Sequence, residues 1–207
     1  EIIYLMKKNL VIVFCKNSVI GKVKTRLAKT IGKSKALKVH NILLAKTISV
    51  LKLLQHDISV FHSDFKPKNN IWSFTKYQEL QNGKNLGFKI QNAFKWGFDL
   101  DYNKICLIGS DLWAIEKNIF TKAFNALNSN DIVFGPSEDG GYYLIGLKKQ
   151  NKKIFKISSW GSSRVLKDSI NQIGSNESVY YLSELNDIDN EKDLNKNEDL
   201  RFLIYNP

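Results

Sequence analysis

The sequence contains few cysteines, prolines and methionines. Its 207 residues include two cysteines, three prolines and one methionine. Cys15 and Cys106 both lie in apolar, strand-like runs, where a thiol usually behaves as a small hydrophobic side chain. A disulfide framework is therefore not expected. The three histidines have no zinc-ligand spacing with either cysteine, which argues against a structural zinc site.

The sequence also lacks an apolar run long enough to cross a bilayer. The longest run, "LVIVFC" at residues 10–15, is far shorter than the roughly 20 residues of a spanning helix. Lys7 and Lys8 precede it, but it is short for a signal peptide and no small-residue cleavage site follows. We therefore expect a cytoplasmic protein without a membrane span.

Acidic residues are in deficit, with 20 Asp and Glu against 31 Lys and Arg and a net charge of +11. A basic surface of this kind can bind nucleic acid. The excess is almost entirely lysine, because the only arginines are Arg26, Arg164 and Arg201, and it accompanies many asparagines and isoleucines. An AT-rich genome favours this composition, and no basic helical stripe or nucleic-acid-binding motif is visible. No nucleic-acid partner is therefore expected.

The residues that are present are typical of one globular domain. Hydrophobic residues make up 43% of the chain and charged residues 25%. A chain of this length can bury roughly 70% of its unfolded surface. No internal repeat, low-complexity segment or linker interrupts it. We expect one domain over residues 9–207, preceded by an N-terminal extension at residues 1–8.

Short apolar runs alternate with amphipathic segments along the chain. The predicted strands are residues 10–15, 57–62, 105–109, 131–135, 142–147 and 178–182, and the predicted helices are residues 34–54, 85–98, 115–127 and 162–173. Ser162 or Ser163 is expected to cap the last helix. This alternation predicts an α/β fold with a mostly parallel sheet and helices on both faces. In such sheets, functional residues gather beyond the carboxyl ends of the strands.

The loop after the first predicted strand, within "FCKNSVIGKVKTRLA" (residues 14–28), gathers cations around one glycine. Its candidate anion-binding residues are Lys16, Gly21, Lys22, Lys24, Thr25 and Arg26. Loop amides together with such cations form a phosphate site. The glycine spacing of a Walker A loop or a dinucleotide fingerprint is absent. A solvated basic loop is the alternative, but the position after the first strand favours phosphate binding.

Two segments could supply carboxylates to the same site. "IGSDLW" places Asp111 just past a buried strand, where it would either cap the next helix or bind Mg²⁺ or Mn²⁺. "LNDIDNEKDL" crowds Asp187, Asp189 and Asp193 before a short helical stretch. Asp193 suits a capping role, whereas Asp189 is better placed to project into a site.

A fourth segment, "GPSEDGGYYLIGL" at residues 135–147, combines acidic residues with a glycine pair. Gly140 and Gly141 allow the backbone to approach a ligand closely or to take positive φ. Asp139 stands at the mouth of the following strand. A tight turn is the alternative, although a hairpin would need neither the acidic pair Glu138 and Asp139 nor the aromatic residues that follow.

These segments, together with "QNGKNLGFKIQNAF" and "WGSSRVL", resemble the DUF2064-type transferases of the glycosyltransferase-A fold, also called selenodomain-associated transferases. That group belongs to the nucleotide-diphospho-sugar transferase superfamily. The matching segments occur in the family's order from about residue 9 to residue 195. The block that contains Gly140 and Gly141 is highly specific, and the "KTRL" block is moderately specific.

The resemblance implies a Rossmann-like glycosyltransferase-A sheet in one domain and a nucleotide held by the first loop, with Ser110 beside it. It implies a divalent metal at Asp111, and the second metal carboxylate of related nucleotidyltransferases matches Asp189. Asp139 would orient the acceptor or act as base. Gly140, Gly141 and Trp160 would line the acceptor site, although Trp160 could equally be a half-buried core residue.

The chain departs from the family pattern at a few positions. The usual DxD motif aligns with residues 109–111, so its first carboxylate is absent, and Asn85 and Trp113 replace an acidic residue and a proline. We expect a metal-assisted, glycosyltransferase-like enzyme with a nucleotide-sugar donor and a small-molecule acceptor. One alternative is a nucleotidyltransferase that releases pyrophosphate. Another is a non-catalytic protein that binds a nucleotide or nucleic acid.

Overall fold

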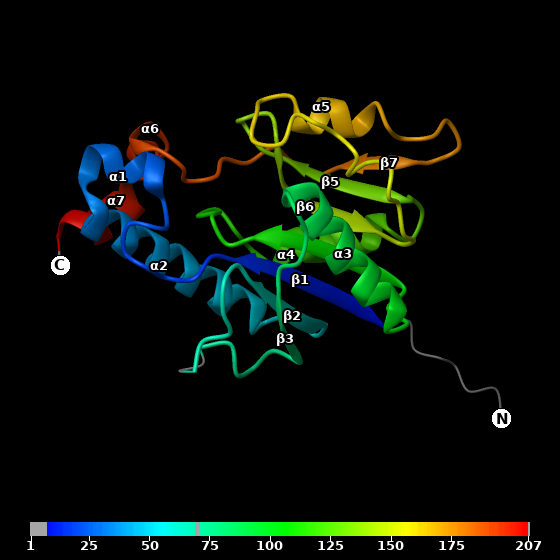
Figure 1. Ribbon diagram of the computed structural model, residues 1–207, viewed down its shortest axis with the longest axis horizontal. Coiled ribbons are helices and arrows are strands. Elements are labelled where there is room, and N and C mark those ends of the chain that lie inside the picture. The colour runs from blue at the N-terminus through cyan, green and yellow to red at the C-terminus, as the bar shows by residue number, and fades with distance from the viewer. Residues whose placement is uncertain (1–7, 69–70, 207) are drawn as a thin grey trace.

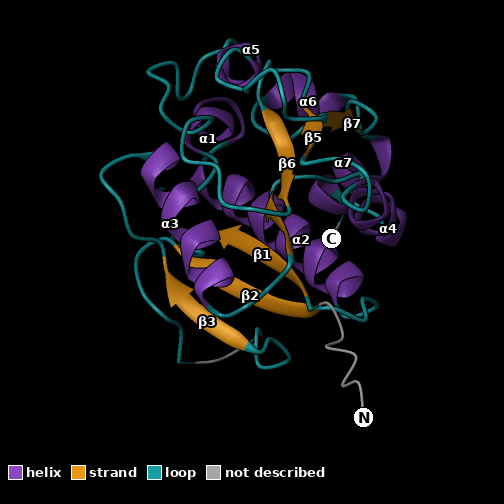
Figure 2. Cartoon of the chain, turned by 90° about the vertical axis from the view of Figure 1, so that its right-hand side faces the viewer, coloured by secondary structure: helices purple, strands orange, loops and turns teal. Residues whose placement is uncertain are grey.

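The computed structural model describes residues 8–68 and 71–206. Its sheet has seven strands: β1 (Asn9–Cys15), β2 (Asp57–His62), β3 (Tyr77–Leu80), β4 (Lys104–Gly109), β5 (Ile132–Pro136), β6 (Tyr142–Leu147) and β7 (Val179–Tyr181). Their order is β3-β2-β1-β4-β6-β5-β7, and β6 alone runs antiparallel to its neighbours. Figure 2 shows β3, β2 and β1 side by side. The predicted α/β fold with a mostly parallel sheet is confirmed.

Helices cover both faces of this sheet. They are α1 (Thr25–Ile31), α2 (Lys33–Leu51), α3 (Leu86–Asp99), α4 (Lys117–Ala126), α5 (Val165–Ile170), α6 (Glu191–Asn195) and α7 (Glu198–Tyr205). None of the helices in the described ranges has both the length and the apolar character that a membrane span requires.

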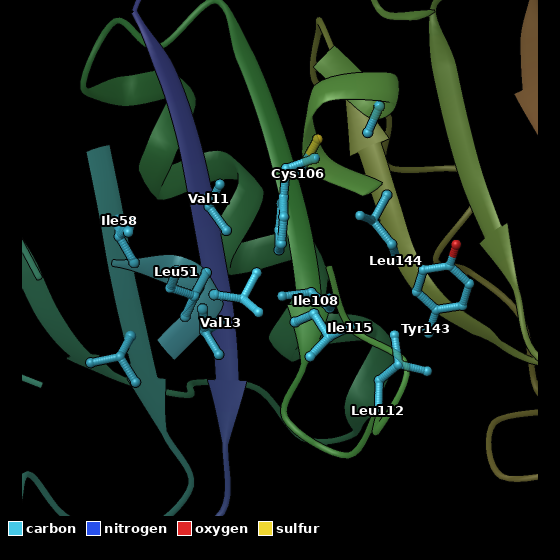
Figure 3. Packing of buried hydrophobic residues seen from close by; sticks show 14 of the residues in the cluster. Val11, Val13, Leu51, Ile58, Cys106, Ile108, Leu112, Ile115, Tyr143 and Leu144 are labelled. Atoms are coloured by element: carbon cyan, nitrogen blue, oxygen red, sulfur yellow. The ribbon is translucent and has the colours of Figure 1, made fainter. Parts of the chain in front are cut away.

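The core forms because alternate side chains of each strand point to opposite faces of the sheet. Val11 and Val13 of β1 belong to a cluster with α2 and α4, which Figure 3 shows around Leu51. Leu10 and Ile12 belong to a second cluster that contains residues of α3. Both faces of β1 are buried, which explains its continuous apolar sequence.

The structure corrects part of the helix prediction. The helix expected at residues 162–173 is reduced to α5, whose N-cap is Arg164 without a side-chain cap. Neither Ser162 nor Ser163 is the N-cap, and the Ser162 hydroxyl instead accepts a hydrogen bond from the Arg164 amide in the loop before the helix. The short elements α1, β3 and α7 were not predicted. Apart from Lys8, the expected N-terminal extension lies outside the described residues.

Asn85 has a clear structural role at the start of α3. Its side chain accepts a hydrogen bond of 3.0 Å from the amide of Phe88. Asparagine and aspartate are both favoured at this position, because either can satisfy a free amide of the first helical turn. The family's acidic residue can therefore be replaced here without loss of the cap.

Candidate functional site

The C-terminal segment at residues 185–193, called the tail below, is attached to the loops that follow β4 and β5. Asp187 pairs with Leu112 in an antiparallel bridge, and the amide of Ile188 donates to the carbonyl of Asp111 at 3.1 Å. Leu185 makes two backbone hydrogen bonds, each of 3.1 Å: its amide donates to the carbonyl of Pro136 at the end of β5, and its carbonyl accepts from the amide of Glu138. These contacts carry the acidic tail to the carboxyl end of the sheet.

A small hydrophobic cluster fixes the tail beside the cationic loop. Ile188 and Leu194 are fully buried against Leu27 of α1 and Leu43 of α2, and residues of α7 complete the cluster. Figure 1 shows α1, α6 and α7 grouped at one end of the molecule. Segments from both ends of the sequence are thereby held at one place.

Asp193 closes the first turn of α6, as the sequence predicted. Its Oδ2 accepts hydrogen bonds of 3.0 Å from the amides of Asp189 and Asn190. The Asn190 side chain accepts one from the Asp193 amide, which completes a capping box. This arrangement fixes the backbone of Asp189, so its carboxylate projects from a rigid support.

The predicted cations and carboxylates meet in one cluster. The Lys24 Nζ lies 2.8 Å from Asp111 Oδ1 and 3.4 Å from Asp189 Oδ1. The Arg26 Nη1 lies 3.7 Å from Asp189 Oδ2. The Lys24 side chain is only 3% exposed, whereas that of Arg26 is 68% exposed. The carboxylates are about two-fifths exposed, so ligands can reach them.

Lys24 adopts an unusual backbone conformation at the start of α1. Its φ of 46° and ψ of 44° lie in the left-handed region, which residues other than glycine rarely occupy. Its side chain does not cap α1. The surrounding structure must therefore stabilise this conformation. Its contacts include the two ion pairs of the ammonium group and a hydrogen bond of 2.8 Å from the Ala28 amide to the Lys24 carbonyl.

The charges of the cluster shift the pKa values of its acids. Burial raises the pKa of Asp111, but the charge and the hydrogen bond of Lys24, together with smaller contributions from neighbouring cations, hold the pKa below its usual value. Burial raises the pKa of Asp187 to about 7, and the charge of Asp111 adds to this effect. The Asp187 carboxylate has no hydrogen bond or ion pair with the described residues. With a pKa of about 7, Asp187 is partly protonated near neutral pH, which limits the negative charge of the cluster.

Two adjoining cavities open at this cluster. The polar cavity, of about 280 Å³, is lined by Lys16, Lys24, Thr25, Arg26, His40, Asp111 and Asp189. The apolar cavity, of about 260 Å³, is lined chiefly by Phe14, Leu86, Ile90, Leu107, Gly141, Tyr142, Trp160 and Val165, with Arg26, Asp139, Asp187 and Asp189 at its charged side. Arg26 and Asp189 belong to both linings, so the two cavities form one cleft.

Four of the predicted site residues line neither cavity: Gly21, Lys22, Ser110 and Gly140. Lys22 is exposed, and Ser110 is buried at the end of β4. Gly140 has a φ of +85°, and a Cβ there would lie 2.0 Å from the carbonyl oxygen of Ser163. Its absent side chain therefore permits close backbone packing against the loop before α5.

Asp139 is held by its own turn. Its Oδ1 accepts hydrogen bonds from the Ser137 hydroxyl at 2.5 Å and from the Gly141 amide at 2.9 Å. These bonds fix the carboxylate at the charged side of the apolar cavity. The second oxygen has no partner among the described residues and is available to a ligand.

Two residues at the candidate site, His40 and Asp187, were not predicted from the sequence. His40 lines the polar cavity, and its Nε2 lies 3.2 Å from the carbonyl of Lys16. Burial lowers the pKa of His40, so its neutral form is favoured. The available signal was a histidine on the apolar face of the predicted helix. Asp187 was noted only as part of an acidic cluster.

The donor atoms suit a hard divalent cation. Asp111 and Asp189 direct one oxygen each toward the same point, where the Lys24 ammonium group now lies. Mg²⁺ and Mn²⁺ favour carboxylate oxygens and often share them with substrate phosphates. Within the described ranges, no group of three or more His, Cys, Asp or Glu is arranged to hold a metal alone. The remaining ligands would have to come from water or substrate.

Comparisons with known proteins agree with this architecture. A family model described as "Uncharacterized protein conserved in bacteria (DUF2064)" matches residues 47–162. None of the curated proteins matches the sequence. A protein from Desulfovibrio desulfuricans G20, named as a candidate nucleotide-diphospho-sugar transferase, superposes with a TM-score of 0.83 and 28% identity. The match covers 92% of this chain and 86% of that one.

More distant solved structures share the fold. The inositol-1-phosphate CTP transferase of T. maritima superposes with a TM-score of 0.54 at 14% identity, over 96% of this chain and 95% of its own. Rv0371C from Mycobacterium tuberculosis H37Rv, solved as a complex with manganese, superposes with a TM-score of 0.53 at 9% identity. That match covers 91% of this chain and 97% of the mycobacterial one. At these identities the likeness establishes the fold alone.

Proposed function

Because the chain belongs to the DUF2064 family, as its motifs predicted, we propose that it is a metal-assisted transferase that uses a nucleotide sugar. In this proposal the polar cavity binds the donor phosphates, and the apolar cavity admits a small-molecule acceptor. The observation that carries it is the meeting of Lys24 and Arg26 with Asp111 and Asp189 in one cleft. The similarity to the Desulfovibrio protein supports a nucleotide-sugar donor.

The cations of the polar cavity would bind the phosphates. Lys16 and Arg26 are exposed there, and the Thr25 hydroxyl lies in the same lining. Charge-assisted hydrogen bonds to phosphate are among the stronger contacts in proteins. Lys22 is exposed in the same loop and adds to its positive potential. A diphosphate would therefore be held mainly by side chains of the segment that follows β1.

Asp111 and Asp189 would hold Mg²⁺ or Mn²⁺ through one oxygen each. When bound, the cation neutralises charge on the leaving phosphate. The chain's own contribution is to fix both carboxylates, through the β4 loop and the capped start of α6. Such preorganisation lowers the barrier because no group has to reorient as charge develops.

The acceptor would enter the apolar cavity and meet its acidic side. The free oxygen of Asp139 would accept the hydrogen bond of an acceptor hydroxyl, which orients the attacking oxygen. The Trp160 ring would form one wall, and Gly141 would let the acceptor approach the backbone. Asp139 is also placed to take the proton that the hydroxyl loses during transfer.

One observation favours nucleotidyl transfer as a second candidate. The second carboxylate of the cluster comes from the tail, as Asp189, and not from a DxD motif at residues 109–111. The fold is also shared with a CTP transferase. In that reaction a nucleoside monophosphate is joined to an acceptor that already carries a phosphate group, and pyrophosphate is released. Glycosyl transfer would instead release a nucleoside diphosphate.

A thermal-shift panel tests the proposal. The full chain is heated with nucleoside di- and triphosphates and nucleotide sugars, each with and without Mg²⁺ or Mn²⁺. A ligand at about 100 times its Kd should stabilise the protein by roughly 2.7 kcal/mol, and the metal should be required. The stabilising donors are then incubated with acceptors, and ³¹P NMR identifies the released phosphate product. Stabilisation by oligonucleotides with no response to any nucleotide would overturn the enzyme proposal.

A further inference from the structure

The buried ammonium group of Lys24 lies where the two proposed metal ligands converge. We propose that Lys24 occupies the cation site of the empty enzyme and must leave it before a divalent cation can bind. The displaced ammonium is then available to the donor phosphates, so metal and nucleotide assist each other's binding. This inference rests on the proposed function, because it assumes that phosphates enter the polar cavity.

Lys24 differs from every other described lysine in its surroundings. It is the only one of them that is buried, whereas Lys16 and Lys22 of the same loop are exposed. Its Nζ lies within 3.4 Å of both Asp111 and Asp189. An ammonium group excluded from solvent between two carboxylates replaces the charge that a bound cation would supply.

The ammonium group and a divalent cation compete for the same oxygens. Mg²⁺ binds carboxylate oxygens at about 2.0–2.1 Å, and Lys24 Nζ is already 2.8 Å from Asp111 Oδ1. A cation placed between the carboxylates would contact the ammonium group, and the two positive charges would repel each other. Metal binding to the empty protein therefore has to break two ion pairs.

Lys24 has a second place available for its charge. It lines the polar cavity together with Lys16 and Arg26, where the proposed phosphates would lie. Its left-handed backbone conformation, with a φ of 46°, is maintained by the present contacts and is not intrinsically favoured. Phosphates that attract the ammonium group free the two carboxylates. By linkage, bound metal must then strengthen phosphate binding by the same factor.

Manganese binding to the full chain without nucleotide tests this competition. Free Mn²⁺ is quantified by electron paramagnetic resonance during titration of the wild type, Lys24→Met and Lys22→Met. Lys24→Met should bind Mn²⁺ about tenfold more tightly than the wild type, because ion-paired hydrogen bonds of this kind are worth about that factor or more. Lys22→Met is the matched control, since it removes one exposed charge from the same loop without breaking an ion pair to a described carboxylate. It should change the affinity less than about twofold.

Two further measurements separate competition from a loss of structure. Circular dichroism checks that Lys24→Met folds, and Lys24→Gln provides a second neutral variant with the same expected gain in Mn²⁺ affinity. In the double variant Asp111→Asn/Lys24→Met the gain should disappear. Pyrophosphate without metal should bind the folded Lys24 variants about tenfold more weakly than the wild type.

Several outcomes would overturn the inference. It fails if the Lys24 and Lys22 variants bind Mn²⁺ equally, or if every neutral Lys24 variant binds it more weakly or does not fold. The last two results would give Lys24 a purely structural role in joining the loop to the tail. Failure of the proposed function would look different. Mn²⁺ would still bind more tightly to Lys24→Met, but neither nucleotides nor pyrophosphate would stabilise any variant.

Discussion

The two cavities share a wall but differ in origin and chemistry. The polar cavity is built from polar and charged residues of the loop after β1, of α1 and α2, of the loop after β4 and of the tail. The apolar cavity is built mainly from side chains of β1, α3, β6 and the loop around Trp160. In the proposed function the two cavities would have different tasks, because charges that bind any phosphate select poorly among acceptors, whereas an apolar cavity selects by shape. Variants on each side should therefore have separable effects.

Asp111→Asn should have the largest effect on ligand binding in the polar cavity. The variant loses one carboxylate charge at the proposed cation site, so the metal-dependent part of nucleotide stabilisation should vanish. Thermal shifts with a nucleotide, with and without Mn²⁺, measure this loss against a wild-type value of roughly 2.7 kcal/mol at 100 times Kd. A wild-type metal response in the variant would remove Asp111 from the site.

Arg26→Ala removes a side chain from the wall that the two cavities share, and it should weaken nucleotide binding there. A charge-assisted contact to phosphate is worth roughly 1.5–3 kcal/mol, so nucleotide affinity should fall about ten- to a hundredfold. Isothermal titration calorimetry measures the change. Because Arg26 is exposed and its pairing with Asp189 spans 3.7 Å, the unfolding midpoint should hardly move. Unchanged affinity would place the phosphates elsewhere.

Trp160→Ala should affect the apolar cavity alone. Loss of its apolar contacts should raise the acceptor KM by about tenfold, which lies at the lower end for removing a buried apolar group. Nucleotide affinity should stay unchanged. Trp160→Phe is the control, because it retains an aromatic wall. An equal loss of nucleotide affinity in Trp160→Ala would mean that the donor, and not the acceptor, occupies this cavity.

A further expected effect is a pH dependence of stability at the junction of the cavities. Burial raises the pKa of Asp187 from 3.8 to about 7, so between these values the folded protein binds a proton that the unfolded chain lacks. Stability from this group is therefore complete below about pH 4 and declines as pH rises toward 7. Asp187→Asn should remove this decline. Urea midpoints of both proteins at pH 5 and pH 8 test it, and parallel changes would assign the pH dependence to other groups.

The sequence predicted the elements that bury one or two continuous apolar faces. β2 and β6 begin and end where expected, because apolar runs such as "DISVFH" and "YYLIGL" leave little choice. The elements that were missed have weak local signals. β3 is polar and short, and α1 begins at a left-handed lysine without a capping side chain. Their positions depend on tertiary contacts that no local pattern records.

The sequence indicated which residue types would form the candidate site, but not which of them would contact each other. Chemistry selected Lys24, Asp111 and Asp189, because cations and carboxylates after strands are typical of phosphate and metal sites. The sequence could not indicate that Lys24 would be buried between the other two, since it lies 165 positions from Asp189. Its contact depends on how the tail packs on α1 and α2. Asp187 was missed because its burial follows from that same packing.

The attachment of the tail also affects when the candidate site is completed during synthesis of the chain. Chains are synthesised from the N-terminus, and strands β1 to β6 precede residue 148. The hydrogen bonds of Leu185 and Ile188 that hold the segment of Asp189 at the cleft join it to loops that are synthesised much earlier. A nascent chain on the ribosome could thus form most of its sheet before Asp189 is available, so the proposed cation site would be completed only after residues 185–189 have been synthesised.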